Sequence, residues 1–377
     1  MRFLLIHKLP YDAGYSGATR TVRSVIRMLA GRGHETVVVS RKSFDKEGEP
    51  PGRSRGNLSS TLTVDQGVKV YAIPQEVNFE KALYYVIRRW KPDCVLIGED
   101  PTYLSLAVVL DTAVKRIVVL VLSQATLPFG PEAFYPDPNL AKLFGSPVEM
   151  VTMSRYVSEY IQRWGRLATV RLPKILHQHL HAPSLGHFDN PFIMFMNASK
   201  IKGLPIVVQL AQQFPASRFA AVRGWATTAH DISELSRHEN ISVLEPKEDV
   251  DAIYSQAKIL LVPSLWGEAF GMVAFEAMVR GIPVLASDIG GLREAKMDVD
   301  YLLPVNPISG YGKTLDERLL PEPMIPVQNM EPWCKALERL LQDREHYDQL
   351  SGESRSVTLK YLESFDETPW VDFLESK

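Results

Sequence analysis

Two glutamates separated by seven residues, Glu268 and Glu276, give the clearest chemical signal in the sequence. Glu268 lies in a Pro-, Ser- and Gly-containing loop, and Glu276 lies in a helix expected over residues 271–280. The first N–H groups of a helix suit a phosphate, whereas a carboxylate accepts hydrogen bonds from neighbouring hydroxyls. A diphosphate flanked by hydroxyl-bearing groups, as in a nucleotide sugar, would satisfy both. The alternative is a solvated glutamate before an ordinary amphipathic helix.

Two further loops could contact such a ligand. Lys200 and Lys202 follow the apolar run 192–196, where a lysine can reach a diphosphate as a mobile charge. The loop over residues 11–18 contains Gly17, and glycine lets a backbone approach a ligand closely. Its spacing is not that of a dinucleotide-binding G-x-G-x-x-G motif. Solvated turn lysines and a plain turn are the respective alternatives.

These segments resemble the retaining glycosyltransferases of family 4, which carry an E-x7-E signature. The resemblance is strongest over residues 259–294, with Pro263-Ser264 before the first glutamate and Gly290-Gly291 after the second. It also includes the N-terminal glycine loop, the turn at 31–35 and the segment 197–203. It implies an α/β chain with the GT-B fold, in which two Rossmann-like open parallel-sheet domains face a central cleft. The first domain would bind mainly the acceptor, and the second mainly the donor.

The resemblance also implies roles for individual residues of the donor domain. Glu276 would hold the hydroxyls of the nucleotide ribose, and Glu268 would contact hydroxyls of the donor sugar. The backbone amides of Phe270, Gly271 and Met272 would face the diphosphate or the sugar.

One position departs from the family pattern. The family commonly has an arginine and a lysine in the loop over 197–203; Lys202 matches the lysine, but Asn197 occupies the arginine position. An amide carries no charge, so one cation on the diphosphate is missing. Lys200 and Arg223 are the candidates to replace it. Gly17 would lie near the donor phosphate and the acceptor.

The function implied is a metal-independent, retaining hexosyltransferase that uses a nucleotide sugar, such as a UDP- or GDP-sugar, and an acceptor hydroxyl. The nucleotide sugar is a substrate, so no cofactor is expected. The acceptor stays open among glycans, lipid-linked glycans and natural products. A GT-B-fold nucleotide-sugar epimerase and a nucleotide-sugar-binding protein without turnover are the alternatives.

Acceptor-side candidates follow two strands of the first domain. Glu99 and Asp100 follow one strand, and Ser123 and Gln124 follow another. Many relatives of the family have a functional histidine at the end of the second of these strands, where this chain has Ser123 and Gln124 instead. The alternative for each residue is capping or solvation.

No metal site is expected. His177, His179 and His181 alternate, which would place three imidazoles on one face of a strand, but no carboxylate is adjacent in sequence. Cys94 and Cys334 have no spacing typical of a zinc site or a disulfide framework. A reducing compartment fits this cysteine content.

Composition narrows the partners. The formal net charge is −2, which gives no reason to expect a nucleic acid. No apolar run reaches the roughly 20 residues needed to cross a bilayer, so a cytoplasmic location is expected. Arg20, Arg23 and Arg27 share one face of the first helix. They suggest peripheral contact with anionic lipids or an anionic acceptor, and a solvated helix face is the alternative. The sequence carries no signal for an oligomeric state.

A length of 377 residues favours two or more domains, and the alternation of apolar runs with amphipathic stretches favours parallel sheets. We expect domains over 1–185 and 189–360, with a linker within 172–191. A C-terminal helix is expected over about 360–377, and packing of this helix back onto the first domain is one alternative. The expected strands are 3–6, 36–40, 68–73, 94–98, 116–122 and a closing strand at 148–153, then 192–196, 219–222, 241–244, 259–262 and 283–287. The expected helices include 19–30, 203–213, 249–256, 271–280 and one from about 291, and residues 42–62 are expected to form an exposed loop.

Overall fold

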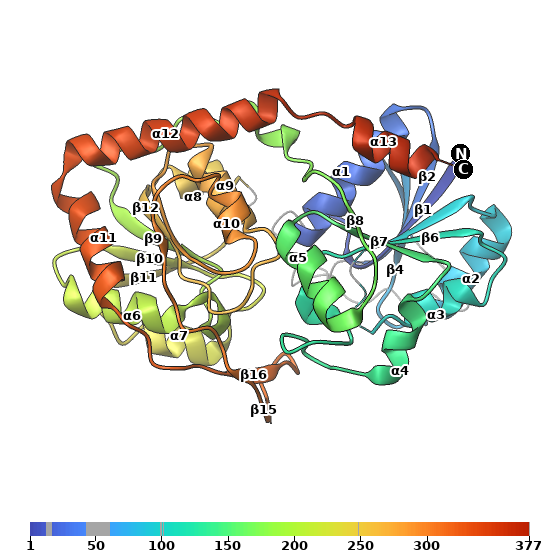
Figure 1. Ribbon diagram of the computed structural model, residues 1–377, viewed down its shortest axis with the longest axis horizontal. Helices are drawn as coiled ribbons and strands as arrows, with labels where there is room; N and C mark the ends of the chain where they lie inside the picture. Colours follow the sequence, from blue (N-terminus) through green and yellow to red (C-terminus); the bar gives the residue numbers. More distant parts are fainter. Residues whose placement is uncertain (13–16, 43–60, 99, 101, 248, 377) are drawn as a thin grey trace. The chain divides into compact units, whose positions relative to one another are not determined.

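The computed structural model describes the chain except for residues 13–16, 43–60, 99, 101, 248 and 377. It divides into two compact units (Figure 1). The first unit comprises Met1–Met153, Val157–Ile175 and Glu367–Lys377, and the second comprises Ser154–Tyr156 and Leu176–Asp366. Each unit is built on its own sheet.

The described residues of the first unit form an eight-stranded sheet in the order β3-β4-β2-β1-β5-β6-β7-β8. Its pairs are parallel except for β3 with β4. The strands are β1 (Arg2–Pro10), β2 (Glu35–Arg41), β3 (Thr61–Asp65), β4 (Val68–Ile73), β5 (Cys94–Ile97), β6 (Arg116–Leu120), β7 (Val148–Thr152) and β8 (Val170–Arg171). The helices in this part of the chain are α1 (Gly17–Gly31), α2 (Phe79–Trp90), α3 (Leu104–Leu110), α4 (Pro138–Ala141) and α5 (Arg155–Tyr160).

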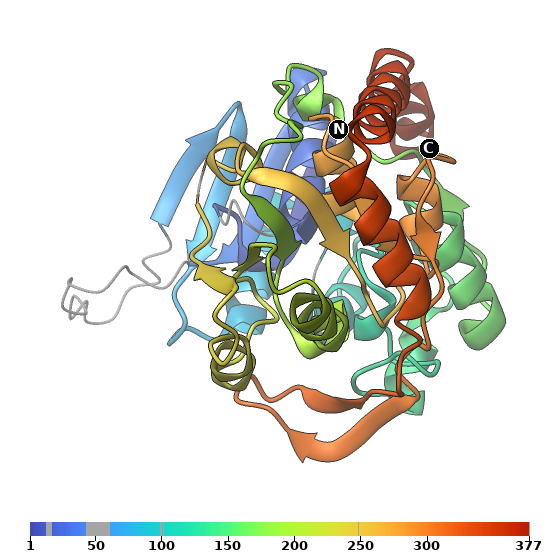
Figure 2. The same cartoon turned by 90° about the vertical axis from the view of Figure 1, so that its left-hand side faces the viewer.

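The described residues of the second unit form a six-stranded parallel sheet in the order β11-β10-β9-β12-β13-β14. The strands are β9 (Phe192–Met196), β10 (Phe219–Val222), β11 (Ile241–Leu244), β12 (Ala257–Val262), β13 (Val284–Ser287) and β14 (Leu302–Leu303). An antiparallel hairpin of β15 (Gly310–Leu315) and β16 (Pro321–Met324), orange in Figure 2, lies outside this sheet. The helices are α6 (Leu204–Gln213), α7 (Ala229–Leu235), α8 (Asp251–Tyr254), α9 (Met272–Met278), α10 (Leu292–Ala295), α11 (Glu331–Gln342) and α12 (Arg344–Glu363).

The central strands are apolar on both faces because both faces of each sheet are covered. Residues Phe3 to Ile6 of β1 and Ile259 to Leu261 of β12 are essentially inaccessible to solvent. A continuous apolar run is typical of such a doubly covered parallel strand. In the second sheet β9 and β12 are parallel neighbours, so their carboxyl ends lie side by side.

Several sequence expectations about elements were wrong. The strand at 148–153 does not close the first sheet, because β8 pairs beyond it; both residues of β8 are exposed, so no apolar pattern marks it. Strand β3 lies at the end of the stretch read as a loop, while residues 43–60 lie outside the described part. The helices expected over 249–256 and 271–280 are shorter, at Asp251–Tyr254 and Met272–Met278.

The C-terminal segment belongs to the first unit. Helix α13 (Thr368–Glu375) buries Trp370 completely, and its indole N–H donates to the carbonyl of Pro173 at 2.7 Å. Arg116 of β6 donates to the carbonyls of Phe373 and Leu374 at 2.6 and 2.9 Å. These contacts join α13 to β6 and to the chain just after β8.

Candidate functional site

Two loops of the second unit meet where β9 and β12 end. The N–H of Leu265 donates to the carbonyl of Ile201 at 2.9 Å, which ties the two loops together. Gly203 has φ +93°, and a Cβ there would lie 1.9 Å from the carbonyl oxygen of Pro263. Glycine is therefore required for this approach. The contact brings the 3-10 turn Lys200–Lys202 against the loop that carries Glu268.

Glu268 is held by three donors. Its Oε1 accepts from the Nζ of Lys202 at 2.6 Å, from the Oγ of Ser264 at 2.5 Å and from the indole N–H of Trp266 at 3.2 Å. Burial opposes ionisation of this carboxyl, but the charge of Lys202 and the three hydrogen bonds outweigh it and hold the pKa of Glu268 below its usual value. Glu268 is therefore ionised, and its side chain is 13% exposed.

Lys202 also lies against two indole rings. Its Nζ is 4.6 Å from the ring centre of Trp266 and 5.8 Å from that of Trp225. An ammonium group is attracted to an indole face, most strongly when it is desolvated. The tryptophans, whose rings lie 6.1 Å apart, were missed in the sequence. The available signal was a tryptophan just after each of β10 and β12, the two strands that flank β9.

The start of α9 supplies backbone donors. Gly271 has φ +101°, and its carbonyl accepts from the N–H groups of Ala274 and Phe275. Among the described residues, no protein acceptor faces the N–H groups of Gly271 and Met272. Helix α9 has only seven residues, so its dipole is short. An anion at this loop would therefore be bound by the local N–H groups.

Glu276 lies at the buried side of α9 and is 2% exposed. The hydroxyl of Tyr254 donates to its Oε2 at 3.1 Å. The Nε2 of His179 lies 3.9 Å from its Oε1. The carboxylate of Glu276 thus has two polar aromatic side chains, Tyr254 and His179, as neighbours.

His179 corrects the expectation of three histidines on a strand. Residues His177–His179 form a 3-10 turn, and His177 is exposed beside Phe365, whereas His179 is buried near Glu276. No group of three potential metal ligands occurs in the described residues. His179 itself was missed as a neighbour of Glu276, because the alternating pattern indicated a strand.

Asn197 acts on the backbone in this structure. It has φ +57°, in the left-handed region that asparagine tolerates. Its Oδ1 accepts from the N–H of Ala226 at 3.0 Å, and Gly224 packs closely against it. The amide thus fixes the loop after β10, where Trp225 lies.

The two cations considered as replacements for the missing arginine are both paired with carboxylates. Arg223 lies 2.7 Å from Glu245, and Lys200 lies 3.6 Å from Glu322. Lys202 is the lysine that the structure brings to Glu268.

The candidates of the first unit make local contacts. Gly17 begins α1, and its carbonyl accepts from the hydroxyl of Thr21; Glu99 lies outside the described residues. Asp100 is buried and lies 3.0 Å from the Nζ of Lys8.

Ser123 and Gln124 lie at the 3-10 turn Gln124–Thr126. The Oγ of Ser123 accepts from the N–H of Ala125 at 3.2 Å, and the buried Gln124 donates to Glu132 at 2.7 Å. Their contacts within the unit are those of capping and packing.

The basic face of the first helix is not the solvated surface considered from the sequence. Arg27 forms a bidentate pair with Asp65 at 2.7 and 2.8 Å, and Arg23 stacks over the ring of Tyr11. Asp65 belongs to β3, the strand that the sequence did not predict. No described helix is both long and apolar enough to cross a membrane.

Residues 190–317 match the family described as glycosyl transferases group 1. The matched part contains Lys202, Glu268 and Glu276. A D-inositol 3-phosphate glycosyltransferase of Corynebacterium aurimucosum is 34% identical over 119 residues. This match covers 31% of the chain and 23% of that relative, so the likeness in sequence is confined to a minor part of either protein.

Solved structures resemble the whole chain. HepE of Anabaena in complex with UDP-glucose aligns with a TM-score of 0.70 and 12% identity, over 99% of this chain and 100% of that one. A glycosyltransferase of Rickettsia africae aligns with a TM-score of 0.65 and 13% identity, over all of both chains. The chain has the GT-B fold, as predicted.

Proposed function

We propose that this chain is a glycosyltransferase that moves a sugar from a nucleotide sugar to an acceptor hydroxyl. The observation that carries the proposal is the pairing of Lys202 with Glu268 beside the N–H groups of Gly271 and Met272. It places a cation, a carboxylate and two backbone donors at the ends of neighbouring strands, where open α/β sheets bind ligands. The family match over the same residues and the UDP-glucose complex of HepE support it.

In this proposal each donor-site residue has one task. Lys202 and the amides of Phe270, Gly271 and Met272 bind the diphosphate or the sugar, and Glu268 accepts a hydrogen bond from a sugar hydroxyl. Glu276 binds the ribose hydroxyls. Because Glu268 is ionised, it can accept hydrogen bonds from hydroxyls, and such charge-assisted bonds are about twice as strong as neutral ones.

We further propose transfer with retention of the anomeric configuration and without a metal ion. The bond between the anomeric carbon and the diphosphate oxygen breaks, and its electron pair leaves with the diphosphate. The acceptor oxygen then bonds to the same face of the carbon and gives its proton to the departing phosphate. Lys202 stabilises the growing negative charge, which is the kind of preorganised stabilisation worth about 2.7–4 kcal/mol per donor.

The test begins with donor binding. Thermal denaturation with UDP-, GDP- and dTDP-sugars should show one nucleotide class that raises the midpoint, with a shift that grows with the logarithm of its concentration once the site is saturated, because it binds the folded state. Incubation of that donor with candidate glycan, lipid-linked and natural-product acceptors should then give a product whose anomeric configuration, read by NMR, equals that of the donor. We expect EDTA to leave the rate unchanged. An inverted product, or no stabilisation by any nucleotide sugar, would contradict the proposal.

A protein that binds nucleotide sugars without turnover is the second candidate. It is favoured by Asn197, which occupies the position of the family's arginine and so supplies no positive charge for the diphosphate. Its amide oxygen instead accepts from the N–H of Ala226. It predicts donor stabilisation with neither sugar transfer nor donor hydrolysis. An epimerase would instead return a nucleotide sugar of altered configuration, which the same NMR spectra distinguish.

A further inference from the structure

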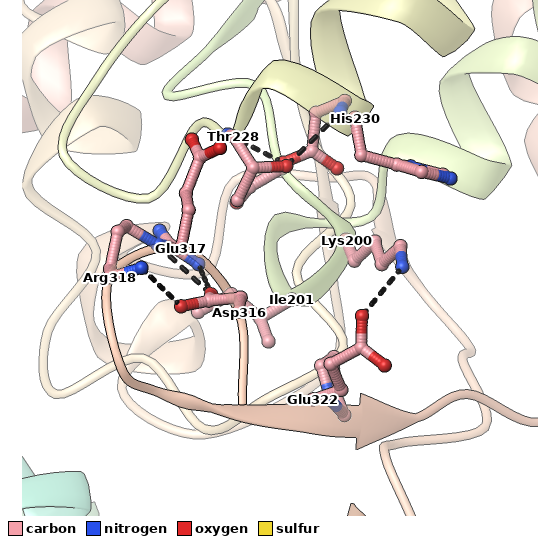
Figure 3. Close-up of a pocket in the computed structure, with 11 residues that line it drawn as sticks. Lys200, Ile201, Thr228, His230, Asp316, Glu317, Arg318 and Glu322 are labelled. Carbon is pink, nitrogen blue, oxygen red and sulfur yellow. Dashed lines mark hydrogen bonds and ion pairs between the residues drawn. The ribbon is translucent and has the colours of Figure 1, made fainter. Parts of the chain in front are cut away.

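The second unit contains a pocket of about 190 Å³ that the donor site does not include. It lies between the 3-10 turn at Lys200, the start of α7 and the β15–β16 hairpin (Figure 3). This volume is smaller than the roughly 300–1,000 Å³ of pockets that enclose a drug-sized ligand. It suits one ring of a larger molecule. The polar side chains that line it are Ser199, Lys200, Thr228, His230, Asp231, Asp316, Glu317, Arg318 and Glu322.

The charges around the pocket are largely paired with one another. Lys200 lies 3.6 Å from Glu322, and Figure 3 shows the two side chains pointing toward each other from the turn and from β16. The guanidinium of Arg318 forms two hydrogen bonds with Asp316, and Glu317 accepts from the N–H of Ala229 at 3.0 Å. The lining has two cations and four carboxylates, so an anionic ligand would meet a net negative surface.

One oxygen of the lining is unsatisfied. Asp231 is 2% exposed, and its Oδ2 accepts from both the N–H and the hydroxyl of Thr228. Its Oδ1 has no hydrogen-bond partner among the described residues. An unsatisfied buried acceptor costs about 1–3 kcal/mol, and a hydrogen-bond donor that reaches this oxygen would remove that cost. A ligand that donates hydrogen bonds therefore suits this pocket.

We propose that this pocket binds one neutral sugar ring of a glycan acceptor. Sugar hydroxyls donate to the carboxylates and accept from Lys200 and His230 without adding charge, whereas a phosphorylated ligand would be repelled by the net negative lining. This inference rests on the proposed transferase function and specifies its substrate class.

The pocket is linked to the donor site by the turn that forms its wall. Lys200 lies in the pocket lining, and Lys202, two residues later, pairs with Glu268. Arg318 of the hairpin donates to the carbonyl of Trp225, whose ring lies near Lys202. A sugar held in the pocket is thus adjacent in structure to the residues that would hold the donor.

Saturation-transfer NMR on the full chain tests the proposal. The probes are the methyl glycosides of glucose, galactose and mannose, with glucose 6-phosphate as the anionic comparison. At least one methyl glycoside should bind saturably in the millimolar range, and glucose 6-phosphate should bind more weakly. Binding should persist in Glu268→Gln, which alters the donor site.

Glu322→Gln and Glu317→Gln should each weaken that binding by about tenfold, as expected for the loss of a hydrogen bond to a charged group. Glu331→Gln is the matched control, because Glu331 forms a similar pair with Lys335 on α11, outside the pocket. His230→Ala, an exposed change, serves as a second variant if a glutamine variant fails to fold. Lack of saturable binding up to tens of millimolar, stronger binding of glucose 6-phosphate, or equal weakening by Glu331→Gln would overturn the inference. Donor binding without sugar binding would reject the pocket alone, whereas loss of donor binding would reject the proposed function.

Discussion

The ammonium group of Lys202 lies 2.6 Å from a carboxylate oxygen of Glu268 and 4.6 Å from the ring centre of Trp266. Replacing this lysine by methionine keeps the aliphatic stem on Trp266 but removes the charge. We expect Lys202→Met to lower the turnover of the bound donor by about 10²–10³-fold, since this is the typical loss for one transition-state donor. Its donor dissociation constant should change less.

Steady-state rates and donor affinity, measured separately, check this prediction. Lys335→Met on α11 is the control, because this lysine forms an exposed pair with Glu331. A variant that loses affinity and keeps its turnover would show that Lys202 serves ground-state binding only.

The ionisation of Glu268 makes a pH-dependent contribution to stability. Its pKa in the folded chain is lowered from 4.5, because the charge and hydrogen bonds of its neighbours outweigh the effect of burial. The stabilisation is therefore present above 4.5 and is lost as pH falls through the folded value. The free energy of unfolding of the wild type, relative to Glu268→Gln, should decrease over that acidic range.

Urea unfolding of both proteins, from neutral pH to below the ordinary carboxyl range, measures this difference. In the Lys202→Met background, burial remains without the opposing charge, so Glu268 should become protonated at higher pH than in the wild type. A difference that grows on acidification would contradict the assigned direction.

Glu276 lies in a different environment from Glu268, with Tyr254 and His179 as neighbours rather than a lysine. If it binds ribose hydroxyls, Glu276→Gln should weaken nucleotide binding about 10–100-fold, the range for a hydrogen bond to a charged group. Calorimetric titration with the nucleoside diphosphate measures the change. Tyr254→Phe removes the contact to Oε2 but leaves the carboxylate, and it should have a smaller effect. An unchanged affinity of Glu276→Gln would reject the ribose assignment.

At the scale of elements, the joint between the β9 and β12 loops depends on one glycine. Gly203→Ala would place a Cβ against the carbonyl of Pro263 in a left-handed conformation, and we expect a loss of at least about 2 kcal/mol. Gly352 in α12 is exposed, with nothing within 4 Å of an added Cβ. Gly352→Ala should therefore stabilise the chain by about 0.5–1 kcal/mol. Urea midpoints of the two variants should move in opposite directions.

The elements also show how far the sequence could be read. Strands β10 and β11 were predicted with their observed bounds, because each is a short apolar run between polar turns. The hairpin β15–β16 was not predicted, since Gly310 and Pro321 disfavour strands and its pairing depends on a partner across a turn.

The candidate site was predictable to the same extent. The placement of Lys202 and Glu268 at the ends of strands followed from their loops, whereas their direct pairing required the order of β9 and β12 in the sheet. The left-handed conformation of Asn197 and the buried position of His179 depend on tertiary contacts that no local pattern encodes.

At the scale of the whole molecule, Trp370 connects the end of the chain to the first unit. It is fully buried, so Trp370→Ala should destabilise that unit by about 3–5 kcal/mol, the usual range for truncating a buried aromatic side chain. The donor site belongs to the second unit, so donor affinity should be retained below the unfolding transition. Trp164, which is 44% exposed, provides the control: Trp164→Ala should change stability by no more than about 0.5 kcal/mol. Equal losses from the two substitutions would contradict the described packing of α13.

Because residues 367–377 belong to the first unit, they matter for expressing that unit on its own. An expression clone that stops after Ile175 would leave the guanidinium of Arg116 without the carbonyls it meets in α13, and would leave empty the buried space that the indole of Trp370 fills. To obtain the amino-terminal half alone, the coding sequence for the last helix must be grafted behind it through a short spacer.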